Sequence, residues 1–388
     1  MPSVCPPVLR RIAAGMVVVF LLVCPPLWSA KLVTSPKIFT SLWHKQVAAQ
    51  LTGLDLTWDG QTVAFTVAPL GSAGEHRLYV FDGTGREMWS AARGLKILGV
   101  SLATDGQYTA IGLMDFSVAL FSKHGKLLWE RKSVGLPHIS PQGQLMIAFN
   151  NGMSGFATPL LEVFRHTGEK VWSFHRKGRV WRSVLSDQGD LLLSLWDGEA
   201  LLIDRKQRIV WQQMFAKDAM ALAISPEDAQ YFAIGTGVLD PSLHLFERTG
   251  RLLWRRSLPL GVTEVSLAKQ GAFLLSYGNT IHGQHVALYS RSGELQWMYH
   301  LKEPATESSK AVVVPDEPLI VAGIERDRQY YLQGFTLTGE LLWMAPVPGP
   351  IFDFRVSHDG RYIAAATDTT LFFFDTQFTE GPKAQLQE

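Results

Sequence analysis

One motif, an apolar strand followed by a short turn and a tryptophan, recurs along this chain of 388 residues. In residues 243–257, LHLFERTGRLLWRRS, the tryptophan stands four residues after the turn glycine. The motif returns after roughly 40 residues, a period typical of propellers and solenoids, in which one unit is too thin to bury its own faces. Its tryptophans are Trp89, Trp129, Trp172, Trp211, Trp254, Trp297 and Trp343.

Each unit has the pattern of four short β-strands. The unit of Trp254 reads AMALAISPEDA, QYFAIGTG, SLHLFERTG and RLLWRRS. Its middle segments are apolar at consecutive positions, as in strands that are buried on both faces. An Asp-Gly or similar pair recurs between the first two strands, where tight hairpins need residues that tolerate a positive φ. Four-stranded units of this length are typical of propeller blades.

The turn before each tryptophan predicts how the blades meet. Gly250 is expected to adopt a positive φ in the hairpin between the third and fourth strands. Trp254 then lies in the outermost strand, where we expect it to cover the gap to the next blade. Gln207 stands where other units have glycine, and we expect a looser or different turn there.

Counting strands predicts eight blades and a way to close the ring. The last set of three strands ends at Asp375 with no tryptophan strand after it, whereas residues 37–45, KIFTSLWHK, supply Trp43 with no strands before it. We expect residues 37–45 to complete the eighth blade, with Ile38 to Trp43 beside Leu371 to Asp375, because closure pairs the edges that an open ring exposes. The fold class is all-β: an eight-bladed β-propeller of four-stranded antiparallel blades over residues 31–380, followed by a tail over residues 381–388.

The first 30 residues predict export. Arg10 and Arg11 precede an apolar run from Ile12 to Cys24, which favours a cleaved signal peptide, with a short membrane anchor as the alternative. Both cysteines, Cys5 and Cys24, lie in this segment, so the remaining chain has no thiol and suits an oxidising, periplasmic compartment. That remainder has a net charge of −1, because two of the 36 basic residues and none of the 35 acidic ones are removed. No nucleic-acid partner is expected.

The glycine-tryptophan motif resembles the quinoprotein-like (PQQ-like) propeller repeat, and the Asp-Gly hairpins resemble the WD40-like repeats of exported proteins. The resemblance covers nearly the whole chain after residue 30 and implies a propeller fold. Members with quinone cofactors oxidise alcohols or sugars with a buried base, a calcium ion and, in many cases, a cysteine pair, which this chain lacks. In length, export and repeat type the chain also resembles propeller lipoproteins of outer-membrane β-barrel assembly.

These observations favour a monomeric, non-catalytic platform for another, envelope-associated protein, with no cofactor and no metal. A PQQ-type quinone-dependent oxidoreductase is one alternative. A small-molecule sensor that binds a ligand in the central channel is another.

A basic rim is the candidate partner-binding surface. Several loops between second and third strands read as long, at residues 69–76, 150–159, 236–241, 279–285 and 325–329. Loops gathered on one face favour partner docking, and the connections between blades, which share that face, are rich in basic residues. The candidate residues are Arg131, Lys132, Arg176, Lys177, Arg179, Trp181, Arg182, Arg255 and Arg256.

Two other features are interpreted as unrelated to function. Trp196, on a short hairpin, is expected to pack. His282 and His285 lie three residues apart in one loop, but a metal ion would need further ligands and none is visible nearby in the sequence.

Overall fold

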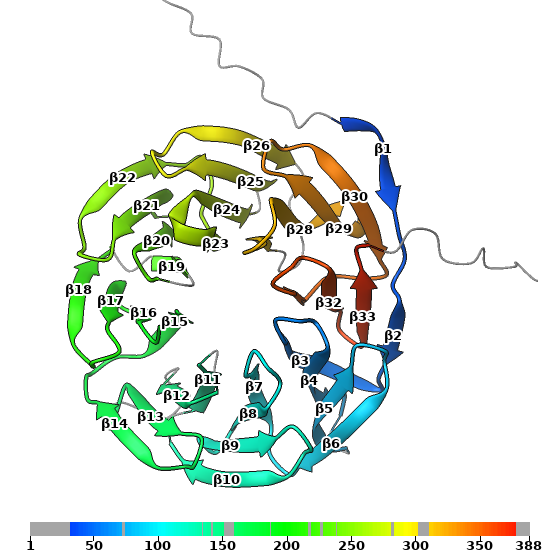
Figure 1. Ribbon diagram of the computed structural model, residues 1–388, viewed down its shortest axis with the longest axis vertical. Helices are drawn as coiled ribbons and strands as arrows, with labels where there is room; N and C mark the ends of the chain where they lie inside the picture. Colours follow the sequence, from blue (N-terminus) through cyan, green and yellow to red (C-terminus); the bar gives the residue numbers. More distant parts are fainter. Residues whose placement is uncertain are drawn as a thin grey trace, which may run out of the picture.

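The computed structural model describes residues 32–377, apart from 72–73, 134, 141–142, 151–158, 187, 216–218, 226–227, 238, 281–282 and 302–309. The predicted signal or anchor segment, the tail over residues 381–388 and His282 lie outside the described residues. Figure 1 shows a ring of sheets in which the first strand of each sheet lies innermost and the fourth outermost. Within the described ranges, no helix is long and apolar enough to cross a membrane.

Eight sheets form the ring, which confirms the predicted eight-bladed propeller. Their middle strands are almost wholly buried, as expected for apolar strands covered on both faces by neighbouring blades. Blades one to four consist of β3 (Ala49–Leu56), β4 (Thr62–Pro69), β5 (His76–Asp82) and β6 (Glu87–Arg93); β7 (Ile97–Leu102), β8 (Tyr108–Leu113), β9 (Ser117–Ser122) and β10 (Leu127–Lys132); β11 (Gly135–Ile139), β12 (Leu145–Asn150), β13 (Leu161–Arg165) and β14 (Lys170–Phe174); and β15 (Val180–Leu185), β16 (Leu191–Leu195), β17 (Glu199–Ile203) and β18 (Ile209–Met214).

The remaining blades have the same antiparallel order, with one short 3-10 turn, η1 (Lys269–Gly271), in blade six. Blades five to eight consist of β19 (Ala219–Ile224), β20 (Tyr231–Thr236), β21 (Ser242–Glu247) and β22 (Leu252–Ser257); β23 (Glu264–Leu267), β24 (Phe273–Thr280), β25 (Gly283–Ser290) and β26 (Leu295–Leu301); β27 (Ala311–Val313), β28 (Leu319–Arg326), β29 (Gln329–Thr336) and β30 (Leu341–Val347); and β31 (Asp353–Val356), β32 (Tyr362–Ala366) and β33 (Thr370–Asp375) with β2 (Trp43–Gln46) as the fourth strand.

The N-terminal segment closes the ring in two places. β2 pairs antiparallel with β33, Trp43 facing Phe373, so the predicted closure of blade eight is confirmed. The prediction placed residues 37–45 in that blade, but Lys37 and Ile38 belong to β1 (Leu32–Ile38), a parallel fifth strand on β30 of blade seven. Figure 1 shows β1 and β2 running in succession along the outer edges of the two last blades.

The recurrent tryptophan forms a hydrogen bond to the next blade at five seams of the ring. Five indole Nε1 atoms donate hydrogen bonds of 2.8 to 3.0 Å to a backbone carbonyl in the next blade's turn between its third and fourth strands. The accepting residue stands two positions before the turn glycine, and a Cβ on that glycine would lie only 2.7 to 2.9 Å from the indole. The residue is therefore glycine for two reasons, a positive φ and the ring packed on it. The five pairs are Trp43–Gly85, Trp89–Gly125, Trp129–Gly168, Trp254–Gly293 and Trp297–Gly339.

Gln207 does not produce the expected looser or different turn. Its φ is +68°, and its N–H donates to the Asp204 carbonyl at 2.7 Å, as Gly250 N–H does to Glu247 at 2.8 Å in the next blade. The Asp204 carboxylate holds the turn, accepting the N–H groups of Lys206 and Arg208. An aspartate that caps two turn amides offsets the cost of a left-handed glutamine.

Two of the loops that read as long are short turns between long strands. β28 and β29 pair as far as Arg326 and Gln329, so only Asp327 and Arg328, both with positive φ, form the turn. β24 and β25 likewise pair as far as Thr280 and Gly283. The sequence interpretation was wrong here because polar residues at the strand ends resemble loop residues.

Candidate functional site

The central channel is lined by two layers of side chains from the eight innermost strands. The two layers differ in depth along the channel. The outer layer, nearer the turns, contains the residue two positions before the first turn of each blade. The inner layer, deeper in the channel, contains the residue four positions before it. The outer layer contains Asp55, Ser101, His138, Val184, Ala223, Ser266, Val312 and Arg355. The inner layer contains Gly53, Gly99, Leu136, Arg182, Ala221, Glu264, Lys310 and Asp353.

Ion pairs link inner-layer residues of different blades. Arg182 of blade four reaches Glu264 of blade six at 3.3 Å, passing over blade five, where this layer has only Ala221. Lys310 and Asp353 pair at 2.6 Å between blades seven and eight.

The outer layer holds a partly shielded carboxylate on blade one. Asp55 accepts hydrogen bonds from the N–H groups of Leu56 at 3.0 Å and Leu102 at 2.7 Å, and its Oδ1 lies 3.6 Å from Arg355. Burial raises the pKa of Asp55 although the charge of Arg355 and these N–H groups lower it. The carboxylate thus has less compensation for lost hydration than its ionised form needs.

His138 of blade three stands in the same layer. Burial, with a further contribution from the Arg355 charge, lowers its pKa to about 4. Its Nδ1 is shielded from solvent and has no hydrogen-bond partner among the described residues. The imidazole is therefore neutral at pH 7 and has unused hydrogen-bonding capacity.

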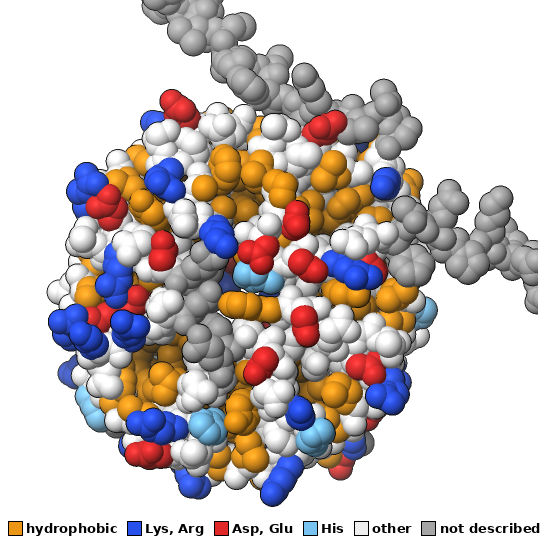
Figure 2. All heavy atoms as spheres, in the orientation of Figure 1, with side chains coloured by type: hydrophobic (Ala, Val, Ile, Leu, Met, Phe, Trp, Pro, Cys, Tyr) orange, Lys and Arg blue, Asp and Glu red, His pale blue; other side chains and the backbone are white. Residues whose placement is uncertain are grey.

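A cavity of about 340 Å³ opens from this layer to one face of the ring. We name the face with the turns between first and second strands and between third and fourth strands the turn face, and the opposite face, with the other connections, the loop face. Figures 1 and 2 look onto the turn face. The cavity's walls are mostly apolar and its floor holds Asp55 and His138. Its lining residues are Asp55, Leu56, Trp58, Ser101, Leu102, Thr104, His138, Ile139, Val184, Leu185, Pro315 and His358.

Backbone hydrogen bonds fix the rim of this cavity across four successive blades. Asp316 N–H donates to His358, His358 to Trp58 and Trp58 to Thr104, at 3.3, 2.8 and 3.1 Å. The Trp58 indole stacks on the His358 ring, with centroids 4.3 Å apart, and His358 Nδ1 lies 2.7 Å from an Asp316 oxygen. Trp58 nevertheless remains 38% exposed at the mouth.

Charge on the turn face is unevenly distributed. Figure 2 shows acidic side chains around the centre of this face and Lys and Arg side chains along much of its periphery, most densely at the left edge. The central acids belong to the first turns of blades seven, eight, one and two. They are the exposed residues Asp316, Glu317, Asp359, Asp59 and Asp105.

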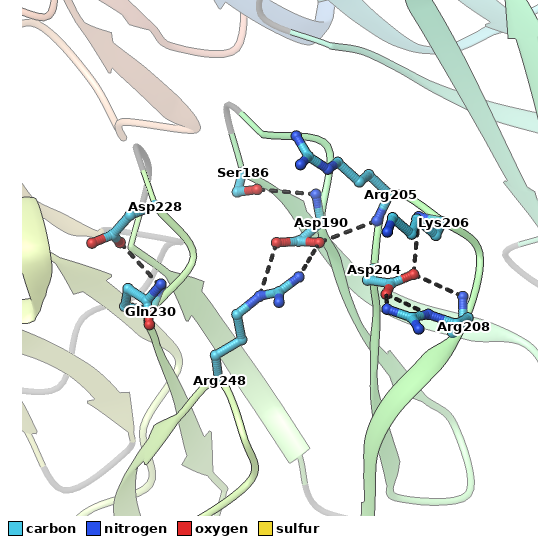
Figure 3. Close-up of polar contacts among 9 residues, drawn as sticks. All are labelled: Ser186, Asp190, Asp204, Arg205, Lys206, Arg208, Asp228, Gln230 and Arg248. Carbon is cyan, nitrogen blue, oxygen red and sulfur yellow. Dashed lines mark hydrogen bonds and ion pairs between the residues drawn. The ribbon is translucent and has the colours of Figure 1, made fainter.

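The basic side of the turn face is built around a buried ion pair between blades four and five (Figure 3). Asp190, only 3% exposed, accepts two hydrogen bonds from the Arg248 guanidinium, at 2.7 and 3.2 Å, and one from Arg205 N–H. Arg208 pairs with Asp204 in the adjacent turn at 2.7 Å. A groove of about 410 Å³ lies along these residues. Because Arg248 and Arg208 are matched by aspartates, we interpret the cluster as a joint between blades.

The predicted basic rim lies on the loop face but does not form one free basic patch. Its members are spread over blades two to five, and four of its eight basic residues pair with an acidic side chain. Lys132 pairs with Asp115, and Arg176 with Glu199. Arg255 donates two hydrogen bonds to Asp240 at 2.7 and 2.8 Å, and Arg182 belongs to the channel.

The other members of the rim differ in their surroundings. Arg131 donates to the Glu130 carbonyl at 3.2 Å, and Arg256 to the Gly293 carbonyl at 2.9 Å. Lys177 is exposed and Arg179 half-buried. Backbone carbonyls therefore hold Arg131 and Arg256, and Lys177 faces solvent.

Trp181 and Trp196 form an aromatic pair on the loop face. Their rings meet edge to face with centroids 4.4 Å apart, and Trp196 is 53% exposed. Met214, 58% exposed, ends β18 beside the turn of Trp196, where Phe215 N–H donates to the Gly198 carbonyl. Trp196 packs, as expected, but half its surface faces solvent. Several other large apolar side chains are exposed at loop-face connections: Leu70, Leu95, Met114, Leu239 and Phe352.

No group of three or more His, Asp or Glu side chains suited to a metal ion occurs in the described part of the chain. His285 is buried on β25, and neither ring nitrogen has a hydrogen-bond partner among the residues that the structure describes. Sequence reasoning missed the channel layers and the pair of Trp58 and His358. The available signal was position, since every layer residue stands two or four places before a first turn.

The comparisons with known proteins bear on the fold. No family model matches the sequence, and no curated protein matches it either. Among solved structures, Sqt1 from Chaetomium thermophilum bound to the N-terminus of the ribosomal protein L10 is 14% identical, with 88% of this chain and 100% of that chain covered and a TM-score of 0.69. BamB from Moraxella catarrhalis is 15% identical, with 86% and 99% covered and a TM-score of 0.61. A chain of the mitotic checkpoint complex is 14% identical, with 97% and 98% covered and a TM-score of 0.58. At these identities the likeness shows that the chain shares the β-propeller fold of these proteins.

Proposed function

We propose that this chain is an exported, non-catalytic platform of the cell envelope and that a protein partner docks on its loop face. The observation that carries the proposal is the cluster of exposed apolar side chains on that face formed by Trp181, Trp196 and Met214. Aromatic residues and methionine are enriched in protein interfaces, and a cluster of exposed apolar groups marks an interaction site more often than scattered ones do.

Two further facts support a protein partner. Sqt1, which has the same fold, was solved bound to a protein segment, the N-terminus of L10. The ion pair beside the aromatic cluster, Arg176 with Glu199, resembles the polar rim that surrounds the apolar centre of an interface.

Site-specific photo-crosslinking tests the docking face. A benzophenone amino acid at Met214 should form a discrete adduct in native envelopes, and the adduct should disappear in the double variant Trp181→Ser, Trp196→Ser. The matched control places the probe at Leu128 and the serines at Leu127 and Leu252, exposed positions on outer strands. Equal adducts at both probe positions, or an adduct that survives the double variant, would contradict docking on the loop face.

The envelope location has its own test. The proposal depends on the apolar run from Ile12 to Cys24 that follows two arginines. Cell fractionation with N-terminal sequencing should find the chain outside the cytoplasm, beginning near residue 31 if it is cleaved. Recovery from the cytoplasm with an intact N-terminus would contradict export.

A further inference from the structure

We propose that the channel-mouth cavity on the turn face binds a lysine or arginine side chain carried by an extended basic segment of a protein partner. This site lies on the opposite face from the docking surface proposed above. It goes beyond that function, because neither site requires the other.

The depth of the cavity holds an acceptor for a cation. Asp55 lies on the floor with Arg355 at 3.6 Å and two backbone N–H donors, yet the balance of burial and these partners still raises its pKa. A second positive charge brought beside it would supply the missing compensation. Coulomb attraction at this depth is stronger than in bulk water.

The walls match the stem of a long basic side chain. Leu102, Ile139, Leu185 and Pro315 line the passage from the mouth to the floor. Lysine and arginine bury their methylene groups along such apolar surface while the charged end reaches a polar group. The size of the cavity, about 340 Å³, lies within the usual range of ligand pockets.

An aromatic group beside this passage has unused binding capacity. The exposed indole of Trp58 stands at the mouth, held flat against His358. An indole face attracts a guanidinium or ammonium group by a cation–π interaction.

The rim selects for positive charge and for a chain longer than one residue. The first turns of blades seven, eight, one and two carry five exposed acids, and the arginine of these turns, Arg361, is already paired with Asp375. In the first turn of blade six, next to these blades, Lys269 approaches Asp316 at 3.8 Å. This excess of negative charge would steer basic segments toward the mouth and repel nucleic acid. Acids spread over four blades favour several cations on one extended segment over a single small amine.

A binding assay with the full chain tests the proposal. The probe is a fluorescein-labelled Gly-Ser peptide with several arginines, followed by anisotropy at low and physiological salt. A peptide with glutamine in place of arginine is the matched probe, and free spermidine is the competitor. The wild-type protein should bind the arginine peptide with an affinity that falls with salt, and should not bind the glutamine peptide.

The variants separate the cavity from general surface charge. Asp55→Asn and, because Asp55 also accepts backbone N–H groups, Trp58→Ala as a second variant should each weaken binding about tenfold, which equals about 1.4 kcal/mol. Asp115→Asn removes the same charge on the loop face and should leave binding unchanged, with circular dichroism confirming that all variants fold.

Equal binding of both peptides, or equal binding by wild type and both cavity variants, would overturn the site. Spermidine binding as tight as the peptide would overturn the protein segment as its occupant. The loop-face serine variants should not alter peptide binding, so failure of the docking proposal remains distinguishable.

Discussion

At the scale of single residues, the indole that packs on each turn glycine explains the recurrent motif. In the turn of Gly250 a Cβ would lie 2.2 Å from Trp211, and φ is +86°. The spacing of glycine and tryptophan is conspicuous in sequence because both residues line a seam: the glycine receives the preceding blade's tryptophan, and the tryptophan four residues later covers the following blade's glycine. The exceptions are instructive. At the seam between blades seven and eight, where the C-terminal strand has no such turn after it, Phe39 packs on Trp343 instead, with centroids 4.9 Å apart.

We expect Gln207→Gly to stabilise the protein, because glycine adopts φ of +68° without the penalty that a left-handed residue with a Cβ incurs. The gain is limited to about 1 kcal/mol, since glycine also increases the entropy of the unfolded chain. The reciprocal variant, Gly250→Gln, should cost on the order of 1 to 3 kcal/mol from overpacking against Trp211, in addition to the strain. Urea denaturation of both variants measures the free energies of unfolding. Loss of stability in Gln207→Gly would show that the glutamine side chain contributes more than its backbone costs.

Buried histidines predict a loss of stability in mild acid. Burial, with a smaller effect of His300, lowers the pKa of His285 to about 4, whereas an unfolded histidine titrates near 6.5. Between these values the unfolded chain binds more protons, so the free energy of unfolding falls as the pH drops from 6.5 toward 4, and no further below that for this group. The slope is at most about 1.4 kcal/mol per pH unit for each histidine. His285→Gln should flatten the dependence measured by urea denaturation between pH 7 and 5, whereas His124→Gln, on an exposed turn, should not. An unchanged slope in His285→Gln would mean that the imidazole is protonated in the fold.

At the scale of strands, the sequence predicted the blades and the closing strand but not β1. Trp43 could be assigned because it carries the same motif residue as the other fourth strands, and β2 pairs with β33 through that position. β1, LVTSPKI, has no tryptophan and contains a proline. It pairs parallel with the free edge of β30 and its register shifts between Leu32 and Lys37. β1 is hydrogen-bonded along one edge only. Such a strand needs no regular pattern of apolar residues, so its sequence gives little sign that it is a strand.

The two N-terminal strands should therefore contribute unequally to stability. Deleting residues 32–38 removes an edge strand and should lower the free energy of unfolding only modestly. Trp43→Ala should cost about 3 to 5 kcal/mol, the usual range for a large aromatic truncation, because the indole stacks on Phe373 at 5.0 Å, approaches Phe81 and donates to Gly83. Denaturation in urea compares the two. A deletion as costly as the substitution would show that β1, and with it the parallel pairing on blade seven, is the main closure.

At the scale of the whole molecule, the candidate site could not be predicted because the cavity is assembled from six of the eight blades. Asp55 and Arg355 lie at opposite ends of the sequence and become neighbours only when blade eight meets blade one. Arg182 and Glu264 meet across the channel only because blade five has an alanine between them. The sequence placed Arg182 in an outer basic rim because its neighbours in the chain are basic. Its side chain points inward, and that direction depends on the register of the strand.

The closed ring also predicts how the protein unfolds. Every blade has two neighbours, and most seams pack a tryptophan of one blade on a turn of the next, so no blade is terminal and none can leave without breaking two seams. An open array of repeats behaves differently, because its terminal units unfold first.

Trp129→Ala, at the seam between blades two and three, and Trp297→Ala, at the seam between blades six and seven, should each cost about 3 to 5 kcal/mol and still unfold in one transition. Tryptophan fluorescence and far-ultraviolet circular dichroism should give coincident midpoints in each variant. Trp196→Ala, whose ring lies outside the seams, is the control and should change stability far less. Separate midpoints for the two probes, or a second transition in one seam variant alone, would show that the ring opens locally before it unfolds.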